Sequence, residues 1–225
     1  MKNTIYIPAR FGSKRFHGKL LKKVGKDSIL ENIVSKIKKI NFKPVIVSGD
    51  KEIVNFAKKK NFYYVKSKKK HISGMSRISE IINKKSPNIV YILFGDELYL
   101  KEKEIKKFIN YVKLKSKDLC WHLLTNINKI DKKDKNVVKC KLNKKREIVD
   151  FCRANKEKYN YKCVGLFAFK KEVLIEYSKF KKFEREVKLK IEQFKLLDNG
   201  INIKSLLIKN IKNSINSKAD LKIGK

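Results

Sequence analysis

The first segment that could do chemistry is a basic loop that follows a short β-type run. Residues 8–19 read Pro-Ala-Arg-Phe-Gly-Ser-Lys-Arg-Phe-His-Gly-Lys. A glycine-containing turn of this kind can bind phosphate through backbone N–H groups and through its cationic side chains. It is not a Walker A loop, because five residues separate Gly12 from Gly18 and Leu20 stands where that motif has serine or threonine. The alternative is a solvated basic surface loop.

A single carboxylate follows the strongest apolar run of the chain. Residues 89–93 read Ile-Val-Tyr-Ile-Leu, and Asp96 comes three residues later. In open α/β sheets the carboxyl ends of the strands line the ligand crevice. Mg²⁺ bound to a nucleoside triphosphate takes one or two protein carboxylates together with the phosphates. Asp96 is therefore a candidate metal ligand, and the alternative is an ordinary turn aspartate.

The third segment whose residue types could do chemistry is His-Ile-Ser-Gly-Met-Ser-Arg at residues 71–77. Its alternative interpretation is a loop and helix cap, with Ser73 as the capping residue. His122, beside Trp121, is predicted to be packed in a strand. Neither a G-x-S-x-G elbow nor an H-E-x-x-H pair occurs, so serine hydrolase and zincin activities have no support.

The elements that must position these residues alternate between strand and helix in the first half of the chain. This alternation predicts an α/β sheet with mainly parallel neighbours. Ser28 and Glu31 form a capping box at a helix start. Strands are expected at residues 4–7, 45–47, 62–65 and 89–93, and helices at 29–37, at 53–60 and from Ile78 onward.

The second half changes pattern. A polar turn at residues 143–146 separates two β-type runs, 137–142 and 147–151, which predicts a hairpin. Further elements are expected as a strand at 163–169, a helix at 184–197 ended by Asn199-Gly200, and a strand at 201–208. We expect one domain over residues 1–225, with an antiparallel insertion at about 130–165 that serves dimerisation.

The composition is strongly basic. The 225 residues include 58 Lys and Arg against 22 Asp and Glu, a formal net charge of +36. The basic residues are mostly lysines spread along the chain, which is typical of codon bias in an AT-rich genome. A dedicated nucleic-acid reader would lean on arginine gathered on one face, so a nucleic-acid partner is not expected. The positive field should still attract anionic ligands such as a nucleoside triphosphate.

The cysteines and the apolar runs bear on the cellular compartment in which the protein is expected. Cys120, Cys140, Cys152 and Cys163 form no C-x-x-C pair and have no zinc-ligand spacing to histidine, so they are predicted to be free thiols in a reducing environment. The N-terminal apolar run is too short for a signal peptide. No apolar stretch approaches about 18 residues, so we expect a cytoplasmic protein without a membrane span.

Taken together, the segments resemble the CMP-Kdo synthetases, the 3-deoxy-manno-octulosonate cytidylyltransferases, over essentially the whole chain. The family's I-P-A-R-x-x-S-x-R-x-P-G-K and H-x-S-G-T-x-R correspond to residues 7–19 and 71–77, with His17 for proline and Met75 for threonine. Its Q-G-D-E-P corresponds to Phe-Gly-Asp-Glu-Leu at 94–98, its N-x-V-K to residues 136–139, and its F-S-R to Phe-Cys-Arg at 151–153. Its L-E-Q-L-R corresponds to Ile-Glu-Gln-Phe-Lys at 191–195. Each motif is weak alone, but their joint order and spacing are specific.

The resemblance implies a fold, a reaction and an assembly. The fold would be Rossmann-like, with a mainly parallel mixed sheet flanked by helices and a small antiparallel insertion. The anomeric hydroxyl of an acidic sugar would attack the α-phosphorus of CTP, with Mg²⁺ as cofactor, giving pyrophosphate and a CMP-sugar for lipopolysaccharide or another surface glycan. A homodimer is expected, also because the hairpin at 137–151 has no obvious place in a parallel sheet and would expose strand edges if left alone.

The resemblance also implies roles for individual residues. The catalytic group would be Arg10, Arg15, Lys19 and Asp96. The nucleotide-binding group would be Ala9, Arg10, Gly12, Ser13, Lys19, Ser73, Gly74 and Arg77. The sugar-binding group would be Phe94, Arg153, Cys163, Phe167, Glu192 and Gln193. The metal ligands would be Asp96 and Asn216.

Several of these positions depart from the family pattern. Asn216 stands where the family has its second metal aspartate, and a unit charge at about 4 Å is worth about 4 kcal/mol at an effective dielectric of about 20. Phe94, Cys163 and Phe167 replace glutamine, histidine and tyrosine. A pocket that loses hydrogen-bonding groups rejects the original polar substrate. Either the sugar differs from Kdo, or the chain is a catalytically weak homologue that binds nucleotide or a protein partner.

Overall fold

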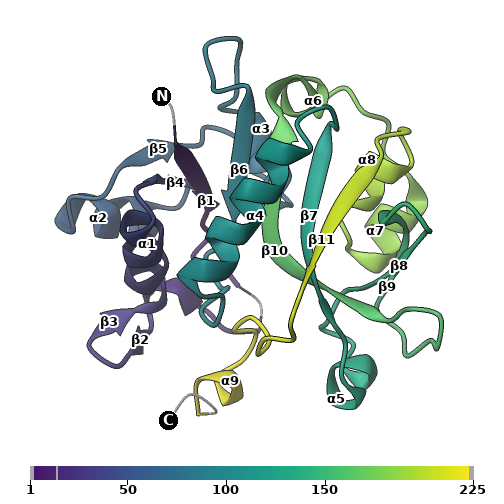
Figure 1. Ribbon diagram of the computed structural model, residues 1–225. Coiled ribbons are helices and arrows are strands. Elements are labelled where there is room, and N and C mark those ends of the chain that lie inside the picture. The colour runs from purple at the N-terminus through teal and green to yellow at the C-terminus, as the bar shows by residue number, and fades with distance from the viewer. Residues whose placement is uncertain (1–2, 14, 223–225) are drawn as a thin grey trace.

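A mixed β-sheet runs through the molecule, and the structure, a computed structural model, describes residues 3–13 and 15–222 (Figure 1). Two further short strands form a separate hairpin. The strands are β1 (Thr4–Pro8), β2 (Lys23–Val24), β3 (Asp27–Ser28), β4 (Lys43–Ser48), β5 (Tyr64–Lys66), β6 (Ile89–Leu93), β7 (Cys120–Asn126), β8 (Lys139–Leu142), β9 (Glu147–Cys152), β10 (Tyr161–Lys170) and β11 (Ile203–Ile208).

Helices connect most of these strands, as the alternating pattern predicted.

No helix among the described residues is long and apolar enough to cross a membrane. The helices are α1 (Ile29–Lys39), α2 (Lys51–Lys59), α3 (Gly74–Ser79), α4 (Glu102–Leu114), α5 (Lys129–Lys133), α6 (Lys171–Glu176), α7 (Glu184–Leu189), α8 (Phe194–Leu197), α9 (Ala219–Lys222) and the 3₁₀ turn η1 (Lys19–Leu21).

The strand order is β5-β4-β1-β6-β10-β7-β11-β9-β8. The first four strands in this order are parallel to one another, and β7 is parallel to β11. Strand β10 runs antiparallel to both β6 and β7. The predicted mixed α/β sheet is therefore confirmed, and β1 and β6 are neighbours with their carboxyl ends at the same edge.

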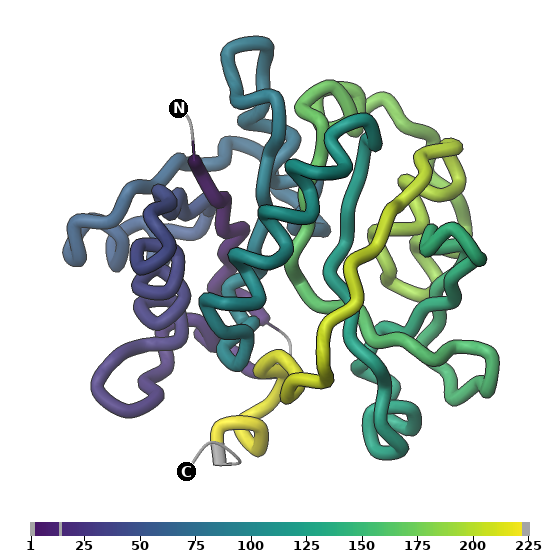
Figure 2. The backbone as a smooth tube through the Cα atoms, in the orientation of Figure 1, coloured from purple at the N-terminus to yellow at the C-terminus, as the bar shows by residue number. Residues whose placement is uncertain are grey.

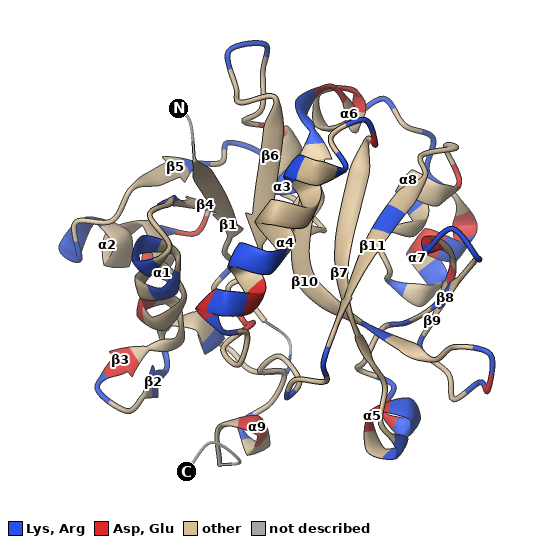
Figure 3. Ribbon diagram, viewed as in Figure 1, with Lys and Arg blue, Asp and Glu red and all other residues tan. Residues whose placement is uncertain are grey.

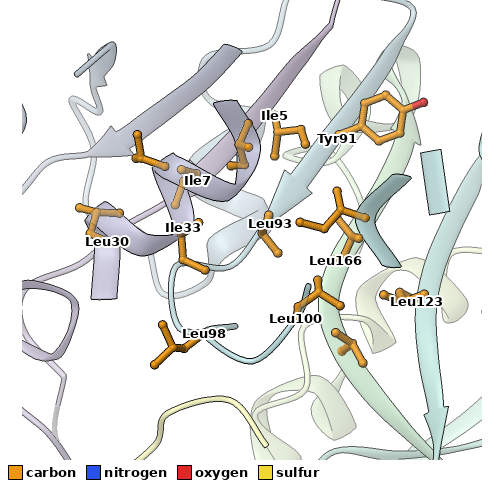
Figure 4. Close-up of a cluster of buried hydrophobic side chains, with 14 of the residues drawn as sticks. Ile5, Ile7, Leu30, Ile33, Tyr91, Leu93, Leu98, Leu100, Leu123 and Leu166 are labelled. Atoms are coloured by element: carbon orange, nitrogen blue, oxygen red, sulfur yellow. The ribbon is translucent and has the colours of Figure 1, made fainter. Parts of the chain in front are cut away.

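The sheet is covered on both faces because alternate side chains of a strand point to opposite sides. One apolar cluster packs between the sheet and α1, α2 and α4, of which α1 and α4 lie in front of the sheet in Figure 1. Figure 4 shows part of it, with labelled side chains from β1, α1, β6, β7, β10 and the loop after β6. The other cluster packs under α3, α6 and α8.

The predicted hairpin is present as β8 and β9, but it is part of the sheet. Strand β9 pairs with β11, and β8 pairs with Tyr161 and Lys162 at the start of β10. Further along β10, residues Leu166 to Lys170 pair with β6 instead, and β10 shifts its register against β7 between Cys163 and Phe167. The hairpin, which had no obvious place in a parallel sheet, is joined to the sheet by antiparallel pairing of both its strands, over two residues each.

Two helix predictions are corrected. The helix expected from Ile78 begins at Gly74 and ends at Ser79, because the Ser73 hydroxyl accepts the Ser76 N–H at 3.2 Å and starts it earlier. The predicted cap at Ser73 is confirmed. The helix expected over 184–197 is split into α7 and α8 by Lys190, which has φ 53°.

The remaining elements agree with the sequence to within a few residues. The Ser28–Glu31 capping box is present at the start of α1. Strand β5 begins two residues later than expected, at Tyr64. The four cysteines are free thiols. Figure 3 shows lysine and arginine on helices and loops across the view, while the central strands are mostly uncharged.

A buried ion pair ties the hairpin region to the C-terminal segment. Lys162 Nζ is 2.7 Å from Asp131 Oδ2, and the two side chains are 4% and 6% exposed. The same ammonium donates to Ile211 O at 2.8 Å and to Asn213 Oδ1 at 2.7 Å. This joins α5, β10 and the chain after β11.

We therefore expect Asp131→Ala to lower the free energy of unfolding by about 3–5 kcal/mol, because it leaves a buried ammonium without its counter-charge. Urea denaturation measures the loss. Glu176→Ala, at the exposed Lys179 pair, is the matched control and should cost about 1 kcal/mol or less. Equal losses for the two variants would contradict the structural role of the buried pair.

Candidate active site

The basic loop after β1 is held in place by the neighbouring strand ends. Ala9 N–H donates to Val47 O at 2.9 Å, and the Phe11 N–H donates to the Asp50 carboxylate. The Arg77 guanidinium donates to the Ala9 carbonyl. Gly18 has φ 64°, and its N–H closes the loop on Phe11 O at 3.0 Å. The loop is thus fixed while Arg10, Gly12 and Arg15 remain exposed.

The centre of the site is a junction of three segments that are far apart in the sequence. Lys19 Nζ lies 2.6 Å from Asp96 Oδ2 and donates to Ile215 O at 2.7 Å. Ile215 N–H in turn donates to Asp96 O at 3.0 Å. Figure 2 shows the C-terminal segment after β11 passing beside the loops that follow β1 and β6. The predicted catalytic pair of Lys19 and Asp96 is therefore in direct contact.

A cavity opens at this junction and collects residues from all parts of the chain. The predicted residues that line it are Arg15, Phe94, Asp96, Arg153, Cys163, Phe167, Gln193 and Asn216. It is also lined by residues for which no role was predicted, among them Glu97, His122, Asn136, Lys162 and Gly165. Predicted catalytic, sugar-binding and metal residues thus share one cavity.

Arg15 at the cavity wall is held by neutral amides. Its guanidinium donates to Asn136 Oδ1, and also to Asn216 Oδ1 at 3.1 Å. Asn216 is itself fixed, because its N–H and that of Ser217 both donate to Asp220 Oδ2 at 2.7 Å. The positive charge of Arg15 is therefore positioned by partners that do not neutralise it.

Arg153 and Glu192 have partners other than those expected. The Arg153 guanidinium donates to the carbonyls of Leu189, at 2.9 Å, and Lys190, at 3.0 Å. Burial lowers the pKa of Arg153. Glu192 does not line the cavity; its Oε2 accepts the Met75 N–H at 2.8 Å, at the start of α3, and burial raises its pKa. The roles of both residues toward a sugar stay predictions.

The remaining nucleotide-binding candidates lie next to the loop. Gly74 packs so closely that a Cβ there would be 2.9 Å from Phe94 Cε1 and 3.2 Å from Pro8 Cγ. Ser73 caps α3, and Arg77 reaches back to Ala9. These residues border the basic loop but are not in contact with the cavity itself.

An aromatic wall forms one side of the cavity. The Phe94 and Phe167 ring centroids are 5.3 Å apart, and Phe167 stacks on His122 at 4.1 Å. Gly165 is required here, because a Cβ would lie 2.8 Å from Phe94 Cβ. Its N–H donates to Glu97 Oε1 at 2.7 Å, and burial, with the neighbouring Asp96 charge, raises the pKa of Glu97 to about 7.

Some of the unpredicted residues carried a signal in the sequence. Glu97 follows Asp96 directly, and Asn136 begins the N-x-V-K segment. His122 and Lys162 carried none, because only the pairing of β7 with β10 and the path of the C-terminal segment bring them to the cavity.

The oxygen atoms at the junction suit a hard divalent cation. Asp96 and Asn216 line the same cavity, and Ile215, the neighbour of Asn216, hydrogen-bonds to Asp96. Mg²⁺ prefers oxygen ligands and keeps few protein carboxylates when it also binds phosphates. In the described part of the chain no group of three or more His, Cys, Asp or Glu side chains could form an all-protein cage. The residues present therefore fit a cation that arrives with a triphosphate.

The fold and this site define a class. A cationic loop after the first parallel strand, facing a carboxylate at the end of the adjacent strand, is the arrangement of an α/β nucleotide-binding enzyme at the carboxyl edge of its sheet. The sequence profile described as cytidylyltransferase matches residues 4–205. The chain belongs to the cytidylyltransferase family of nucleotidyltransferases.

Its relatives within that family are named more narrowly. A 3-deoxy-manno-octulosonate cytidylyltransferase of Fusobacterium nucleatum is 30% identical over 194 residues, which covers 80% of this chain and 77% of the relative. The enzyme of the same name from Alteromonas mediterranea is 27% identical over 200 residues, 80% of each chain. The solved structure of a CMP:2-keto-3-deoxy-manno-octonic acid synthetase complexed with CTP superposes with a TM-score of 0.89 at 21% identity, covering 99% of this chain and 96% of the other.

Proposed function

We propose that this protein transfers the cytidylyl group of CTP to Kdo or a related acidic ulosonic sugar and releases pyrophosphate. The observation that carries the proposal is the cavity at the Asp96 junction, which joins the basic loop to the predicted sugar-binding residues. The names of the relatives, and CTP in the structure with the same fold, support it. The CMP-sugar would serve lipopolysaccharide or another surface glycan, and the enzyme would act in the cytoplasm.

The residues of the site can be assigned parts in this transfer. The anomeric hydroxyl of the sugar attacks the α-phosphorus of CTP, and negative charge develops on the leaving pyrophosphate. Arg10 and Arg15 bind the triphosphate from the loop, and Lys19 is placed at the junction to offset that charge. The amide partners of Arg15 leave its charge available to the phosphates.

Asp96 would hold Mg²⁺ in this scheme, with Asn216 as a neutral second oxygen ligand. The cation supplies charge neutralisation on the phosphate oxygens. Lys19 also acts as a positioning residue, because its ion pair with Asp96 holds the carboxylate in place before the cation arrives. Asn216 lines the same cavity; Asp220 fixes its backbone N–H, and its Oδ1 accepts from Arg15.

A second candidate function is favoured by the aromatic wall. Phe94 and Phe167 are in ring contact where the family has hydrogen-bonding side chains, and the Arg153 donors are taken up by backbone carbonyls. A chain with these features could bind nucleotide tightly and turn over slowly. A weak homologue of this kind remains the alternative to the active enzyme.

The proposed activity predicts that pyrophosphate is released from CTP only when an acidic sugar is present. The measurement is a coupled pyrophosphate assay with CTP against a panel of ulosonic acids that includes Kdo. ATP in place of CTP is the control and should give little release. Sugar-independent release, or no release with any member of the panel, would contradict the active-enzyme proposal.

The metal assignment predicts that Asp96→Asn lowers kcat by about 100-fold or more, because the charge that binds the cation is lost. Circular dichroism should show an unchanged fold. Asp27→Asn, at an exposed position of the β2–β3 hairpin, is the matched control and should keep the wild-type rate. A wild-type rate for Asp96→Asn at saturating Mg²⁺ would show that Asp96 is not the metal ligand.

Asn216 stands where the family has an aspartate, so restoring a carboxylate at this position should strengthen Mg²⁺ binding. Asn216→Asp should lower the Mg²⁺ concentration for half-maximal rate by about tenfold, because a carboxylate adds attraction, partly screened, that the amide lacks. Asn216→Ala separates this charge effect from loss of the Arg15 hydrogen bond and should not lower the requirement. A Mg²⁺ titration of pyrophosphate release tests both variants. An unchanged requirement in Asn216→Asp would place residue 216 away from the metal.

We also propose that the protein is a homodimer. The exposed apolar side chains of Ile130 and Val149, which are 80% and 43% exposed, lie in the region predicted to serve dimerisation. Light scattering at micromolar concentration should give twice the mass of the 26.5 kDa chain. Val149→Lys should shift the mass toward the monomer, since it places a charge in an apolar contact. A monomeric wild-type mass would refute the proposal.

A further inference from the structure

One nitrogen of a buried histidine in the cavity wall has no partner. His122, in β7, is 0% exposed and lines the cavity beside Phe167. Its Nε2 lies 3.0 Å from Val164 O. A carbonyl oxygen only accepts hydrogen bonds, so Nε2 carries the proton and donates. Nδ1 is then a lone-pair acceptor, and it has no hydrogen-bond partner among the described residues.

The protonation state of this ring is fixed by its surroundings. Burial lowers the pKa of His122 to about 3. At any pH where the protein works, the imidazole is therefore neutral, and Nδ1 can accept but not donate. Phosphate and carboxylate oxygens accept hydrogen bonds and do not donate them. Neither group can therefore bind to Nδ1 of the neutral His122 ring.

The orientation of the ring is fixed as well. Phe167 stacks on it at 4.1 Å with an interplanar angle of 26°, and the bond to Val164 holds the opposite nitrogen. A 180° turn of the ring would break the bond to Val164, and smaller turns would break the stack on Phe167. A buried acceptor that is held without a partner costs free energy, and in native proteins such groups are usually completed by an ordered water, an ion or a ligand.

No described side chain donates a hydrogen bond to Nδ1. Phe94 and Phe167 have no donor, and Cys163 has only a weak one. The Lys162 ammonium is taken up by Asp131, Ile211 and Asn213. A neutral hydrogen-bond donor such as a hydroxyl group fits this part of the wall.

We propose that His122 Nδ1 accepts a hydrogen bond from a hydroxyl group of the acceptor sugar and so determines which sugar binds. This inference rests on the proposed function, since it names a contact of the same substrate. This hydrogen bond would be a polar contact on the wall of the cavity where Phe94, Cys163 and Phe167 offer few hydrogen-bonding groups. A sugar that lacks the hydroxyl, or that has an acceptor-only group in its place, would be discriminated against.

The kinetic test uses two variants that separate the ring nitrogens. In His122→Gln the amide N–H can replace Nε2 toward Val164, while the acceptor at the Nδ1 position is lost. In His122→Asn the amide oxygen replaces Nδ1, while the bond to Val164 is lost. We expect His122→Gln to raise KM for the sugar by about 3- to 10-fold with KM for CTP unchanged, and His122→Asn to retain sugar affinity closer to wild type.

A binding test follows His122 directly in the wild-type protein. The ¹⁵N resonance of His122 Nδ1, assigned by its loss in His122→Gln, should shift when the sugar is added and should not shift with CTP alone. The chain has three histidines, so the assignment is simple. This test does not require turnover.

The outcomes separate the two proposals. If the wild type is active but His122→Gln keeps the wild-type KM for sugar, or changes both KM values equally, the His122 inference is wrong. If the wild type shows no turnover with any sugar, the proposed function fails. The NMR titration then still tests whether a sugar binds at His122. An Nδ1 resonance that does not move with any sugar of the panel would overturn the inference.

Discussion

The contact between Lys19 and Asp96 is the interaction on which the site depends. It joins the loop after the first strand to the end of β6, and the backbone of Ile215 closes it from the C-terminal segment. The sheet makes this contact possible, because β1 and β6 are parallel neighbours and end at the same edge. At 12% and 24% side-chain exposure, the pair is shielded from solvent but still open to the cavity. Because the pair is partly shielded from solvent, electrostatic interactions between a charged ligand and these side chains are stronger here than in water.

The rest of the cavity divides into a charged side and an aromatic side. On the charged side, Arg15 is held by two asparagine oxygens, so its position is fixed without a counter-charge. On the aromatic side, Phe94 and Phe167 replace polar groups, and His122 stacks against them. Gly165 makes this side possible by letting Phe94 and Glu97 approach the backbone of β10. In the proposed function, anion binding belongs to the charged wall of the cavity and sugar selection to the aromatic wall.

Much of the fold could be predicted from local patterns. The run at 89–93 and the capping box at Ser28 each specified an element that the structure contains. Helix α4 was not predicted, although Ile105, Phe108, Ile109 and Val112 have the spacing of a helix face. The break between α7 and α8 could not be found locally, because Arg153 binds the carbonyls of residues 189 and 190 at that point.

The same distinction applies to the site. Asp96 and the basic loop could be proposed from their place after strands, because topology alone puts strand ends together. The place of the hairpin within the sheet could not be predicted, since it depends on the pairing of β8 with β10 and of β9 with β11, two strands outside the hairpin. His122 was predicted to be a strand residue, and it is one, but its orphaned nitrogen depends on Val164 and Phe167, which lie about forty residues further along the chain. Such contacts are set by tertiary packing and leave no periodic signal.

The central claim is that the Lys19–Asp96 junction is the reaction centre. The most direct measurement is a crystal structure of the protein with CTP and Mg²⁺. The account predicts the cation on the Asp96 carboxylate, the Lys19 ammonium moved from Asp96 to a phosphate oxygen, and the triphosphate along the loop of residues 9–19. A triphosphate bound elsewhere, or a cation held without Asp96 while the Lys19 pair stays intact, would contradict it.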